Sequence, residues 1–399
     1  MTPSLLLWHP QGRLLAQNAG TWPTLELAPS DSPTEKLRET AQIEAWLLHD
    51  GGLMAGRQEP LHLQALTENL PTGWAWAAAE ASPLPRAQMW QRPGWRARIL
   101  EWLSEQGIHT PELRLISSTD LNTVVEVKTG GRLLFLKVSA SPLEAAFSAY
   151  LSRRQPELLP PLLAAGGGWQ LSETGGELLE GSADLQAWEQ ALRRLAAFQT
   201  SADAGTLAEL GAERLPFAAV WARVTTLLEA DDVLRGWGLT PEKVGQLQAA
   251  RPVLERQFER WQALGLPDLP AHGDAHPRNA LVGQRGAVWF DWSETKAAAH
   301  PLLDAGWFLF FALHPAREGL KIRQAYPDLG ERLSAAYAEA LGCPAAAAVL
   351  TENASIALTL MCRAAIYDET FRTWEGTVVG WRPNYVGYYL GQVAQILNV

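Results

Sequence analysis

The chain has 399 residues, of which 47% are hydrophobic and 19% are charged, a balance typical of a globular protein of two or three domains. Its formal net charge of −10 disfavours a nucleic-acid partner, because phosphate backbones are bound by clustered Lys and Arg. No apolar run approaches the roughly 20 residues of a membrane helix, the N-terminal sequence has no signal-peptide pattern, and only Cys343 and Cys362 are present. We therefore expect a cytoplasmic protein without a membrane partner, and composition leaves its oligomeric state open.

Residues 1–88 are expected to form a small accessory α+β domain. The segments "SLLLWHP" and "RLLAQ" flank a "QG" turn, which predicts a β-hairpin. The stretch "SPTEKLRETAQIEAWLL" follows and predicts a helix over residues 33–48, with Ser32 as its cap and Pro33 at its first position. Three prolines and a glycine in residues 81–94 predict a linker.

Residues 89–180 and 181–399 are expected to form a small β-rich lobe and a larger helical lobe. A helix is predicted from Trp95, followed by strands in "LRLISS", "NTVVEVKTGG" and "RLLFLKVSA", the last two joined at Gly130-Gly131 as an antiparallel hairpin. Helical patterns dominate the third region, where Thr240 and Pro241 mark the start of one helix.

The segment "HGDAHPRN", residues 272–279, concentrates polar side chains ahead of two short strands, "NALVG" and "AVWFDW". Asp274 then lies in the loop before a hairpin, Asn279 at its start and Asp291 at the end of its second strand. Because the two ends of a hairpin lie close together, Asn279 and Asp291 can approach one point. An amide and a carboxylate oxygen suit Mg²⁺, and Asp274 could accept a proton from a hydroxyl nearby.

This segment, followed by Asp291-Trp292, resembles the signature of the aminoglycoside phosphotransferase and choline kinase superfamily, which is related to the protein kinases. The resemblance implies a bilobal, protein-kinase-like α+β fold. It also implies Mg²⁺-dependent transfer of the γ-phosphate of ATP, or of another nucleoside triphosphate, to a hydroxyl of a small molecule such as an aminoglycoside, amino alcohol or sugar. Asp274 would be the catalytic base, Asn279 and Asp291 would hold the magnesium, and His272 and Asp304 would be structural.

A kinase also needs groups that bind the nucleotide, and the resemblance assigns them upstream of the catalytic loop. Lys137, on an apolar strand, would reach the phosphates, and Glu144 would hold that lysine. The nucleotide loop would be residues 117–127, with Ser118, Thr119 and Asn122, and the hinge would be residues 168–181. There Ser172 to Thr174 would offer backbone groups to adenine, and Gly175-Gly176 would let the chain turn. Taken singly, these features are also typical of a surface lysine, a helix start and a plain turn.

Two other readings of the loop remain open. His272, Asp274 and His276 could ligate a transition metal in a hydrolase, although no second histidine cluster completes such a site. The chain could also be a non-catalytic, kinase-like nucleotide-binding module, although the base, the metal ligands and the lysine are all present. His276 alone is expected mainly to hold the loop.

The acceptor is expected on the helical lobe, where two features could receive an amine or a quaternary ammonium group by charge and cation–π contact. One is the acidic stretch of Glu229, Asp231 and Asp232. The other is an aromatic tail comprising Trp374, Trp381, Tyr385, Tyr388 and Tyr389. A solvated loop and ordinary core aromatics are the alternatives.

Residues 1–80 resemble the opening of a Nudix hydrolase domain, in which a helix carries Arg-Glu and, two residues later, paired glutamates that bind magnesium. Arg38-Glu39 matches this pattern, but Gln42 and Ile43 occupy the paired positions. The upstream glycine and glutamate of that family fall on Thr24 and Ser30. The resemblance therefore implies an accessory domain without a hydrolase site, since an amide and an isoleucine do not supply clustered carboxylates.

Overall fold

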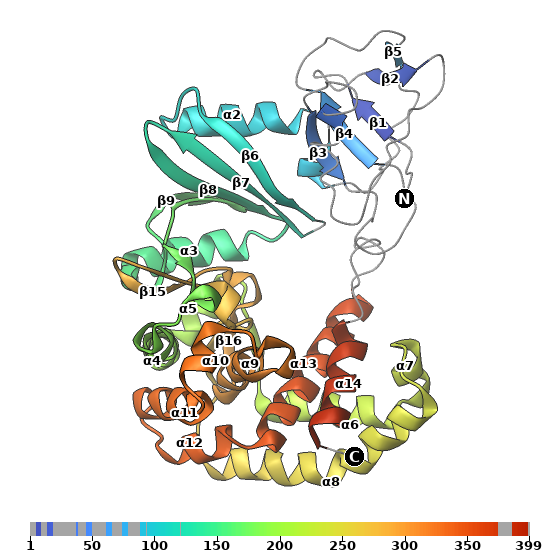
Figure 1. Cartoon of the computed structure of the whole chain (residues 1–399), viewed down its shortest axis with the longest axis vertical. Helices are drawn as coiled ribbons and strands as arrows, with labels where there is room; N and C mark the ends of the chain where they lie inside the picture. Colours follow the sequence, from blue (N-terminus) through green and yellow to red (C-terminus); the bar gives the residue numbers. More distant parts are fainter. Residues whose placement is uncertain are drawn as a thin grey trace. The chain divides into compact units, whose positions relative to one another are not determined.

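The computed structural model describes residues 5–8, 14–18, 37–38, 45–49, 61–65, 74–78, 88–92, 94–119, 121–373 and 385–397, which fall into two compact units. The first unit contains the described residues up to Ala140, together with Trp169–Glu173. The second unit contains Ser141–Gly168 and the described residues from Thr174 onward. The mixture of sheets with a larger helical part confirms the expected α+β class (Figure 1). The domain boundaries at residues 88 and 180 stay a prediction.

The first sheet of the first unit has the strand order β3-β4-β1-β2-β5. Its strands are β1 (Leu5–Trp8), β2 (Leu14–Asn18), β3 (Ala45–His49), β4 (Leu61–Ala65) and β5 (Trp74–Ala78). The β1–β2 pair is antiparallel, with Trp8 opposite Leu15, so the predicted hairpin is confirmed. The prediction of a helix up to residue 48 is wrong at its end, because Ala45–His49 pairs antiparallel with β4. A short apolar run such as "AWLL" fits either structure by periodicity, and pairing with a neighbouring strand decides it.

The second sheet of this unit includes β6 (Glu112–Ser118), β7 (Asn122–Thr129), β8 (Arg132–Ser139) and β10 (Trp169–Glu173), in the order β6-β7-β8-β10 with antiparallel neighbours. The predicted hairpin about Gly130-Gly131 is confirmed as β7–β8. Helix α2 (Trp95–Glu105) packs on this sheet through Trp95 and Trp102, whose rings lie 4.8 and 5.1 Å from that of Trp169. Within the predicted linker, a 3-10 helix, η2 (Met89–Gln91), buries Trp90, whose indole donates to Thr119 O at 2.6 Å.

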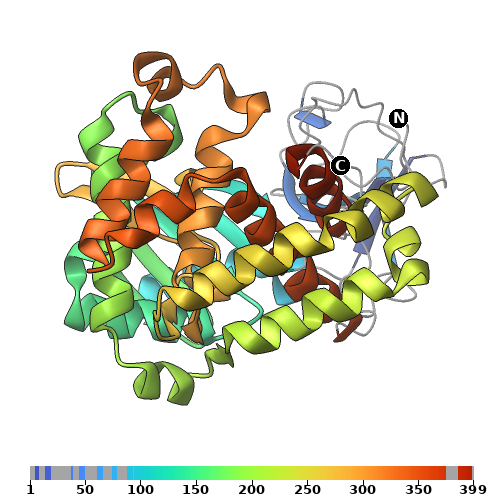
Figure 2. The ribbon, with the colours of Figure 1, turned by 90° about the horizontal axis from the view of Figure 1, so that it is seen from below.

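The second unit is mainly helical. Up to the loop at residues 272–279 its elements are α3 (Leu143–Arg154), η3 (Pro156–Leu158), β9 (Leu162–Gly166), β11 (Glu177–Leu178), η4 (Leu179–Gly181), α4 (Leu185–Ser201), α5 (Ala204–Glu209), β12 (Glu213–Leu215), α6 (Phe217–Glu229), α7 (Asp231–Gly236) and α8 (Pro241–Ala263). Helix α8 begins as predicted, since the Thr240 hydroxyl accepts from Lys243 N at 3.3 Å and Pro241 takes the first position. It runs beside α6, as seen from below in Figure 2.

The remaining elements surround the loop at residues 272–279. They are β13 (Leu269–Ala271), η5 (Pro277–Asn279), β14 (Ala280–Gly283), β15 (Gly286–Trp289), η6 (Trp292–Glu294), β16 (Lys296–Ala299), α9 (Leu302–Leu313), η7 (Pro315–Arg317), α10 (Lys321–Ala325), α11 (Leu329–Ala340), α12 (Ala345–Leu350), α13 (Asn353–Thr373) and α14 (Tyr385–Leu397). Strands β14 and β15 pair antiparallel, so this predicted hairpin is confirmed too. The orders β11-β14-β15 and β12-β16-β13 describe the two small sheets that present the loop.

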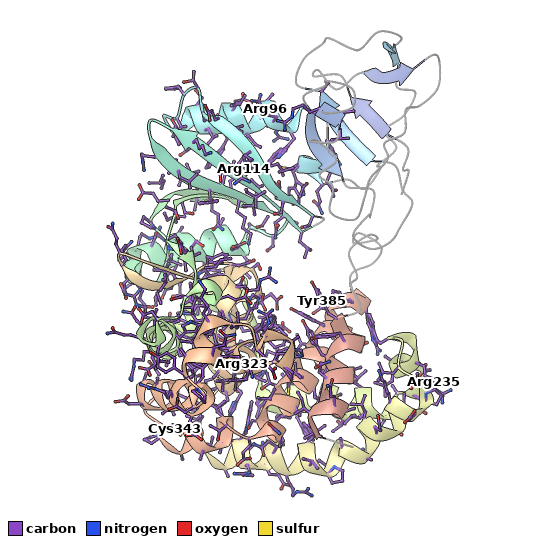
Figure 3. The ribbon with its side chains drawn as sticks, viewed as in Figure 1. Arg96, Arg114, Arg235, Arg323, Cys343 and Tyr385 are labelled. Atoms are coloured by element: carbon purple, nitrogen blue, oxygen red, sulfur yellow. The ribbon has the colours of Figure 1, made fainter. Side chains whose placement is uncertain are left out.

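Helices α9 and α13 pack closely in the core of this unit. A side chain at Gly306 of α9 would place its Cβ 2.1 Å from Thr359 Oγ1 of α13, so only glycine fits there. One turn further along α13, Cys362 is buried and free, and Cys343 (labelled in Figure 3) is also free. No helix among the described residues has the length and hydropathy to cross a bilayer.

Candidate active site

Asp304, in the first turn of α9, holds the backbone of the loop at residues 272–279 by hydrogen bonds. Its carboxylate accepts the backbone N–H groups of His272 at 2.7 Å and Gly273 at 3.0 Å, and the amide of Gln199 at 3.2 Å. Burial raises the pKa of Asp304 to about 6, against the opposing effect of these donors. Asp304 therefore fixes the path of the loop, in the supporting position that the resemblance implies.

Gly273 is required by the tight path of the loop. Its φ of 83° is in the left-handed region, and a Cβ there would lie 2.0 Å from the backbone oxygen of Glu294. A residue with a side chain would be both strained and in collision with backbone. The glycine of the His-Gly-Asp segment is thus explained by close packing of the loop on η6.

His272 is fully buried, and both of its ring nitrogens have partners within the protein. Nδ1 accepts Asp274 N–H at 3.3 Å, and Nε2 lies 3.0 Å from Phe290 O, which together favour the neutral tautomer with its proton on Nε2. Burial lowers the pKa of His272 to about 4. A ring engaged in this way is not placed to ligate a metal, and the described residues include no group of three or more His, Cys, Asp and Glu that could hold one.

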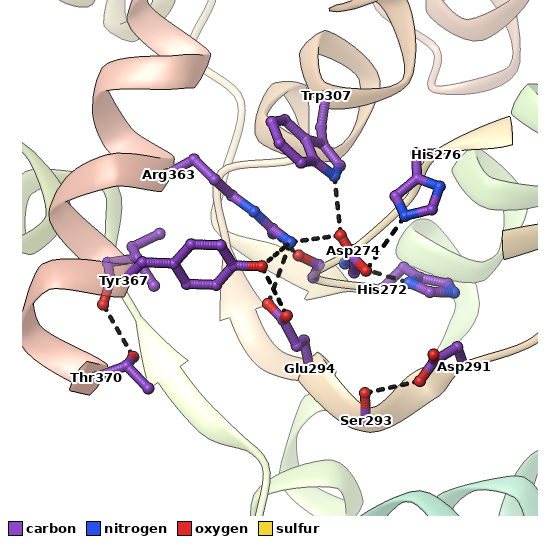
Figure 4. Close-up of polar contacts among 12 residues, drawn as sticks. His272, Asp274, His276, Asp291, Ser293, Glu294, Trp307, Arg363, Tyr367 and Thr370 are labelled. Carbon is purple, nitrogen blue, oxygen red and sulfur yellow. Dashed lines mark hydrogen bonds and ion pairs between the residues drawn. The ribbon is translucent and has the colours of Figure 1, made fainter. Parts of the chain in front are cut away.

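Asp274 lies at the centre of a convergent set of donors (Figure 4). Its Oδ1 accepts from Trp307 Nε1 at 2.9 Å and from Arg363 Nη2 at 2.5 Å. Its Oδ2 accepts from Asn279 Nδ2 at 3.0 Å and faces His276 Nε2 at 3.4 Å. Burial by itself raises the pKa of Asp274, but Arg363 and His276 outweigh it and hold that pKa well below its usual range. The side chain is still 21% exposed, so a substrate can reach this ionised carboxylate.

Asn279 and Asp291 lie at the open end of the β14–β15 hairpin. Phe290 N donates to Asn279 O at 3.0 Å, which places Asp291 one residue beyond a direct backbone link to Asn279. Asn279 also donates to Asp274 O at 3.0 Å. Asp291 adopts a left-handed conformation, with φ and ψ both 59°, and its Oδ1 accepts the Ser293 hydroxyl at 2.8 Å. Such backbone strain is common at functional sites.

His276 braces the loop. Its Nδ1 accepts Arg278 N–H at 3.2 Å and caps η5, and its ring stacks on Phe311 with 4.4 Å between centroids. With Nδ1 occupied as an acceptor, Nε2 carries the proton that points at Asp274. His276 is thus a positioning residue for that carboxylate.

Sequence reasoning missed the side chains that close the site from α13 and η6. Arg363 pairs with Asp274 and with Glu294 Oε2 at 3.2 Å, and its Nη1 donates to Gly273 O. Tyr367 accepts from Arg363 Nη2 at 2.8 Å and donates to Glu294 Oε1 at 2.8 Å. The available signal was a single arginine within the apolar run "ALTLMCRAAIY", because a charge on a buried helix face requires partners.

The residues predicted to bind the nucleotide lie on both units. Ser118 and Asn122 flank the β6–β7 turn, in which the Thr119 hydroxyl accepts the backbone N–H groups of residues 121 and 122 at 3.2 and 3.1 Å. Lys137 lies on the less buried face of β8 with Leu133 and Phe135, and Ser172 lies on β10. These side chains belong to the first unit.

Glu144 and Thr174 belong to the second unit. Glu144 is in the first turn of α3 and is 1% exposed, which does not fit a solvated helix start, since a buried carboxylate is rarely left without a partner. The Thr174 hydroxyl interacts with the backbone of Gly176 at 3.3 Å, at the predicted turn. The nucleotide roles of all six residues stay predictions.

Two of the three acidic residues proposed for the acceptor have partners within the protein. Glu229 pairs with Arg251 at 2.8 Å, and Asp231 accepts from Gln248 at 2.7 Å and lies 3.9 Å from Arg235. By contrast, two tyrosines of the aromatic tail lie beside the site around Asp274. Tyr385 at the start of α14 (labelled in Figure 3) stacks on Tyr389, whose ring lies 5.1 Å from that of Trp307. Trp374 and Trp381 lie outside the described residues, as do the key positions of the Nudix resemblance other than Arg38.

No protein-family model and no curated protein matches the chain. Among solved structures, the chain is similar to choline kinase from Cryptosporidium parvum, with 13% identity over 76% of this chain and 95% of that one and a TM-score of 0.53. It also matches ethanolamine kinase from Plasmodium vivax, with 12% identity, 72% and 81% coverage and a TM-score of 0.48. A spectinomycin phosphotransferase in complex with ADP and spectinomycin matches at 12% identity, 76% and 97% coverage and a TM-score of 0.46. The chain therefore has the fold of choline kinase, and the fold expected from its loop signature is confirmed.

Proposed function

We propose that the chain is an ATP- and Mg²⁺-dependent phosphotransferase that moves the γ-phosphate to a hydroxyl of a small molecule, with Asp274 as the base. The observation that carries this proposal is the ionised, partly exposed carboxylate of Asp274, fixed by Asn279, His276 and Trp307. It lies on the same loop that leads into the Asn279–Asp291 hairpin. The choline kinase fold supports the same reaction class.

In the proposed reaction the acceptor oxygen bonds to the γ-phosphorus while the bond from that phosphorus to the bridging oxygen breaks. ADP leaves, and the acceptor proton goes to Asp274. Phosphoryl transfer depends mostly on positioning and charge. On the acceptor side of the reaction, the main requirement is therefore that the Asp274 carboxylate is held in a fixed position. His272 and Asp304 meet it by fixing the loop backbone.

The donor set fits magnesium. Asn279 and Asp291 are neighbours at one end of a hairpin and offer hard oxygen atoms, the ligands that Mg²⁺ prefers while keeping water and phosphate for its other positions. The ion, when bound, would neutralise charge on the phosphates. On the nucleotide side we propose that Lys137 contacts the phosphates and that Glu144 orients it. Ser118, Asn122, Ser172 and Thr174 would contact the rest of the nucleotide.

The transition-metal hydrolase is disfavoured by the hydrogen bonds at both nitrogens of His272 and by the capping role of His276. The non-catalytic module differs from the kinase only in turnover. An assay of ADP release from Mg·ATP with a panel of hydroxyl compounds therefore tests the proposal. Acceptor-dependent ADP release that is lost in Asp274→Asn supports it, whereas nucleotide binding without turnover across sugars, polyols, hydroxy acids and amino alcohols contradicts it.

A further inference from the structure

The guanidinium of Arg363 occupies an aromatic enclosure next to Asp274. Its central carbon lies 4.6 Å from the centroid of Trp307 and 4.8 Å from that of Tyr367. Tyr389 lies beside both rings, with centroid distances of 5.1 and 6.2 Å. A cation over aromatic faces, with carboxylates close by, is the arrangement by which proteins recognise quaternary ammonium ligands. Here the cation belongs to the chain itself.

The carboxylates of the enclosure are engaged by the same group. Arg363 lies 2.5 Å from Asp274 Oδ1 and 3.2 Å from Glu294 Oε2, and its side chain is 9% exposed, against 21% and 32% for its two partners. Its Nε is buried and has no hydrogen-bond partner among the described residues. The position of the guanidinium is therefore set by its charge and by the rings rather than by complete hydrogen bonding.

We propose, on the basis of the proposed function, that Arg363 is a specificity residue and that the acceptor is a hydroxyl compound without a positively charged group. A cationic head group would need the same aromatic faces of Trp307 and Tyr367 and the same two carboxylates. The guanidinium of Arg363 already occupies these contacts. An uncharged or anionic hydroxyl compound meets no such conflict and can still reach the exposed part of Asp274. This narrows the acceptor to polyols, sugars and hydroxy acids and excludes amino alcohols.

The test uses the full chain and tetramethylammonium as the probe, with binding measured by calorimetry and by the fluorescence of Trp307 and its neighbours. Arg363→Ala removes the guanidinium and leaves two carboxylates facing aromatic rings. We expect this variant to bind the probe at least about 30-fold more tightly than the wild type, which is the factor that a desolvated cation–π contact provides. Arg363→Lys is the matched control, because it keeps a cation on α13 and should bind as weakly as the wild type.

Adding Trp307→Leu to Arg363→Ala should remove the gained binding. Equal binding of the probe by the wild type and by a folded Arg363→Ala variant would overturn the proposal. If Arg363→Ala does not fold, Arg363→Gln, a neutral side chain of similar reach, takes its place under the same criterion. If neither folds, wild-type binding decides alone, since clear binding of tetramethylammonium by the wild type contradicts a filled enclosure.

A second arm compares choline with its uncharged isostere, in which carbon replaces the ammonium nitrogen, as acceptors or competitors in the ADP-release assay. The wild type should favour the uncharged compound. Efficient phosphorylation of choline by the wild type would contradict the proposal that the acceptor carries no positive charge. The proposed kinase activity and the proposed uncharged acceptor can be refuted independently of each other. Absence of any acceptor-dependent ADP release refutes the kinase, whereas probe binding in Arg363→Ala is read without turnover.

Discussion

Two aspartates belong to the same loop region, Asp274 within the loop and partly exposed, Asp304 beneath its backbone and buried, yet their environments shift their pKa values in opposite directions. Asp274 accepts from a guanidinium and faces His276, and its pKa lies well below the usual range. Among the described residues, Asp304 at the start of α9 accepts from backbone N–H groups and from the amide of Gln199, and its pKa is raised to about 6. Burial raises the pKa of both groups; the direct contacts of Asp274 with Arg363 and His276 outweigh it, whereas the hydrogen-bond donors at Asp304 and the charge of Arg363 do not.

The exposure and the hydrogen-bond partners of the two carboxylates distinguish the one proposed to react from the one that supports the loop. Asp274 is ionised, 21% exposed and supported by four side-chain donors, as the proposed base has to be. Asp304 is 3% exposed and accepts from the backbone of the loop. Substituting either residue by its amide should therefore have different consequences, one on turnover and the other on the pH dependence of stability.

The largest effect is expected from Asp274→Asn. Turnover should fall by about 10²–10⁴-fold because a positioned base contributes that much, while fold and nucleotide affinity are retained. Steady-state ADP release with saturating Mg·ATP measures it, and circular dichroism provides the control for folding. Turnover near that of the wild type would show that Asp274 is not the base. The distinction between a reactive Asp274 and a supporting Asp304 would then be wrong.

Asp291→Ala extends the contrast to a third aspartate, which is proposed to bind the metal. Binding of Mg·ATP should be abolished, because the ion that bridges the phosphates loses its carboxylate ligand. Calorimetry measures this loss, and Ser293→Ala, which keeps that carboxylate, is the matched control. Unchanged affinity in Asp291→Ala would show that magnesium is held elsewhere.

For Asp304→Asn we expect a change in the pH dependence of stability. The pKa of Asp304 rises from 3.8 to about 6 on folding, so its stabilising contribution is full below pH 4 and is lost as pH rises through 6. Relative to the wild type, the variant should therefore gain about 2 kcal/mol between pH 4 and pH 7. Urea unfolding at the two pH values measures it, and a constant difference between the two proteins would contradict the assignment.

His300→Phe should shift the same curve the other way. His300 stacks on Trp261 and packs at a tilt against Phe217, and burial lowers its pKa from 6.5 to about 4. Its contribution to stability is present above pH 6.5 and is lost as pH falls through 4. Phenylalanine keeps the stacking but cannot bind the proton, so the variant should lose about 1–2 kcal/mol less than the wild type between pH 7 and pH 5. Parallel unfolding curves at these pH values would count against it.

The smallest expected effect is none at all. The full chain should show no Mg²⁺-dependent hydrolysis of nucleoside diphosphate derivatives, because Gln42 and Ile43 stand where paired glutamates would be needed. Product analysis by chromatography checks this, with Asp274→Asn as the background that removes the proposed kinase reaction. Robust hydrolysis there would reveal a second active site in the first 88 residues.

Sequence predicted those parts of the site that are local in the chain. The order of loop, turn and strands placed Asp274 before the hairpin and brought Asn279 near Asp291, because register and turn chemistry act over a few residues. The strand at Ala45–His49 was missed because a short apolar run fits a helix or a strand by periodicity, and only its pairing with β4, beyond the local sequence, decides between them.

Arg363 was missed for the same reason on a larger scale. It lies 89 residues after Asp274, on a helix that packs closely against α9 at Gly306. No local pattern of charge or periodicity links the two residues. The identity of the acceptor depends on such distant side chains, so it was also beyond reach of the sequence.

The low pKa of Asp274 has a kinetic consequence for the proposed enzyme. A base whose pKa lies well below its usual range does not itself produce the acidic limb of a pH–rate profile near neutral pH. That limb has to come from another group, and the buried neutral histidines His272 and His300, whose pKa values are about 4, are the groups that take up protons when the chain unfolds in acid. On its acidic side, the activity curve should therefore follow the stability curve.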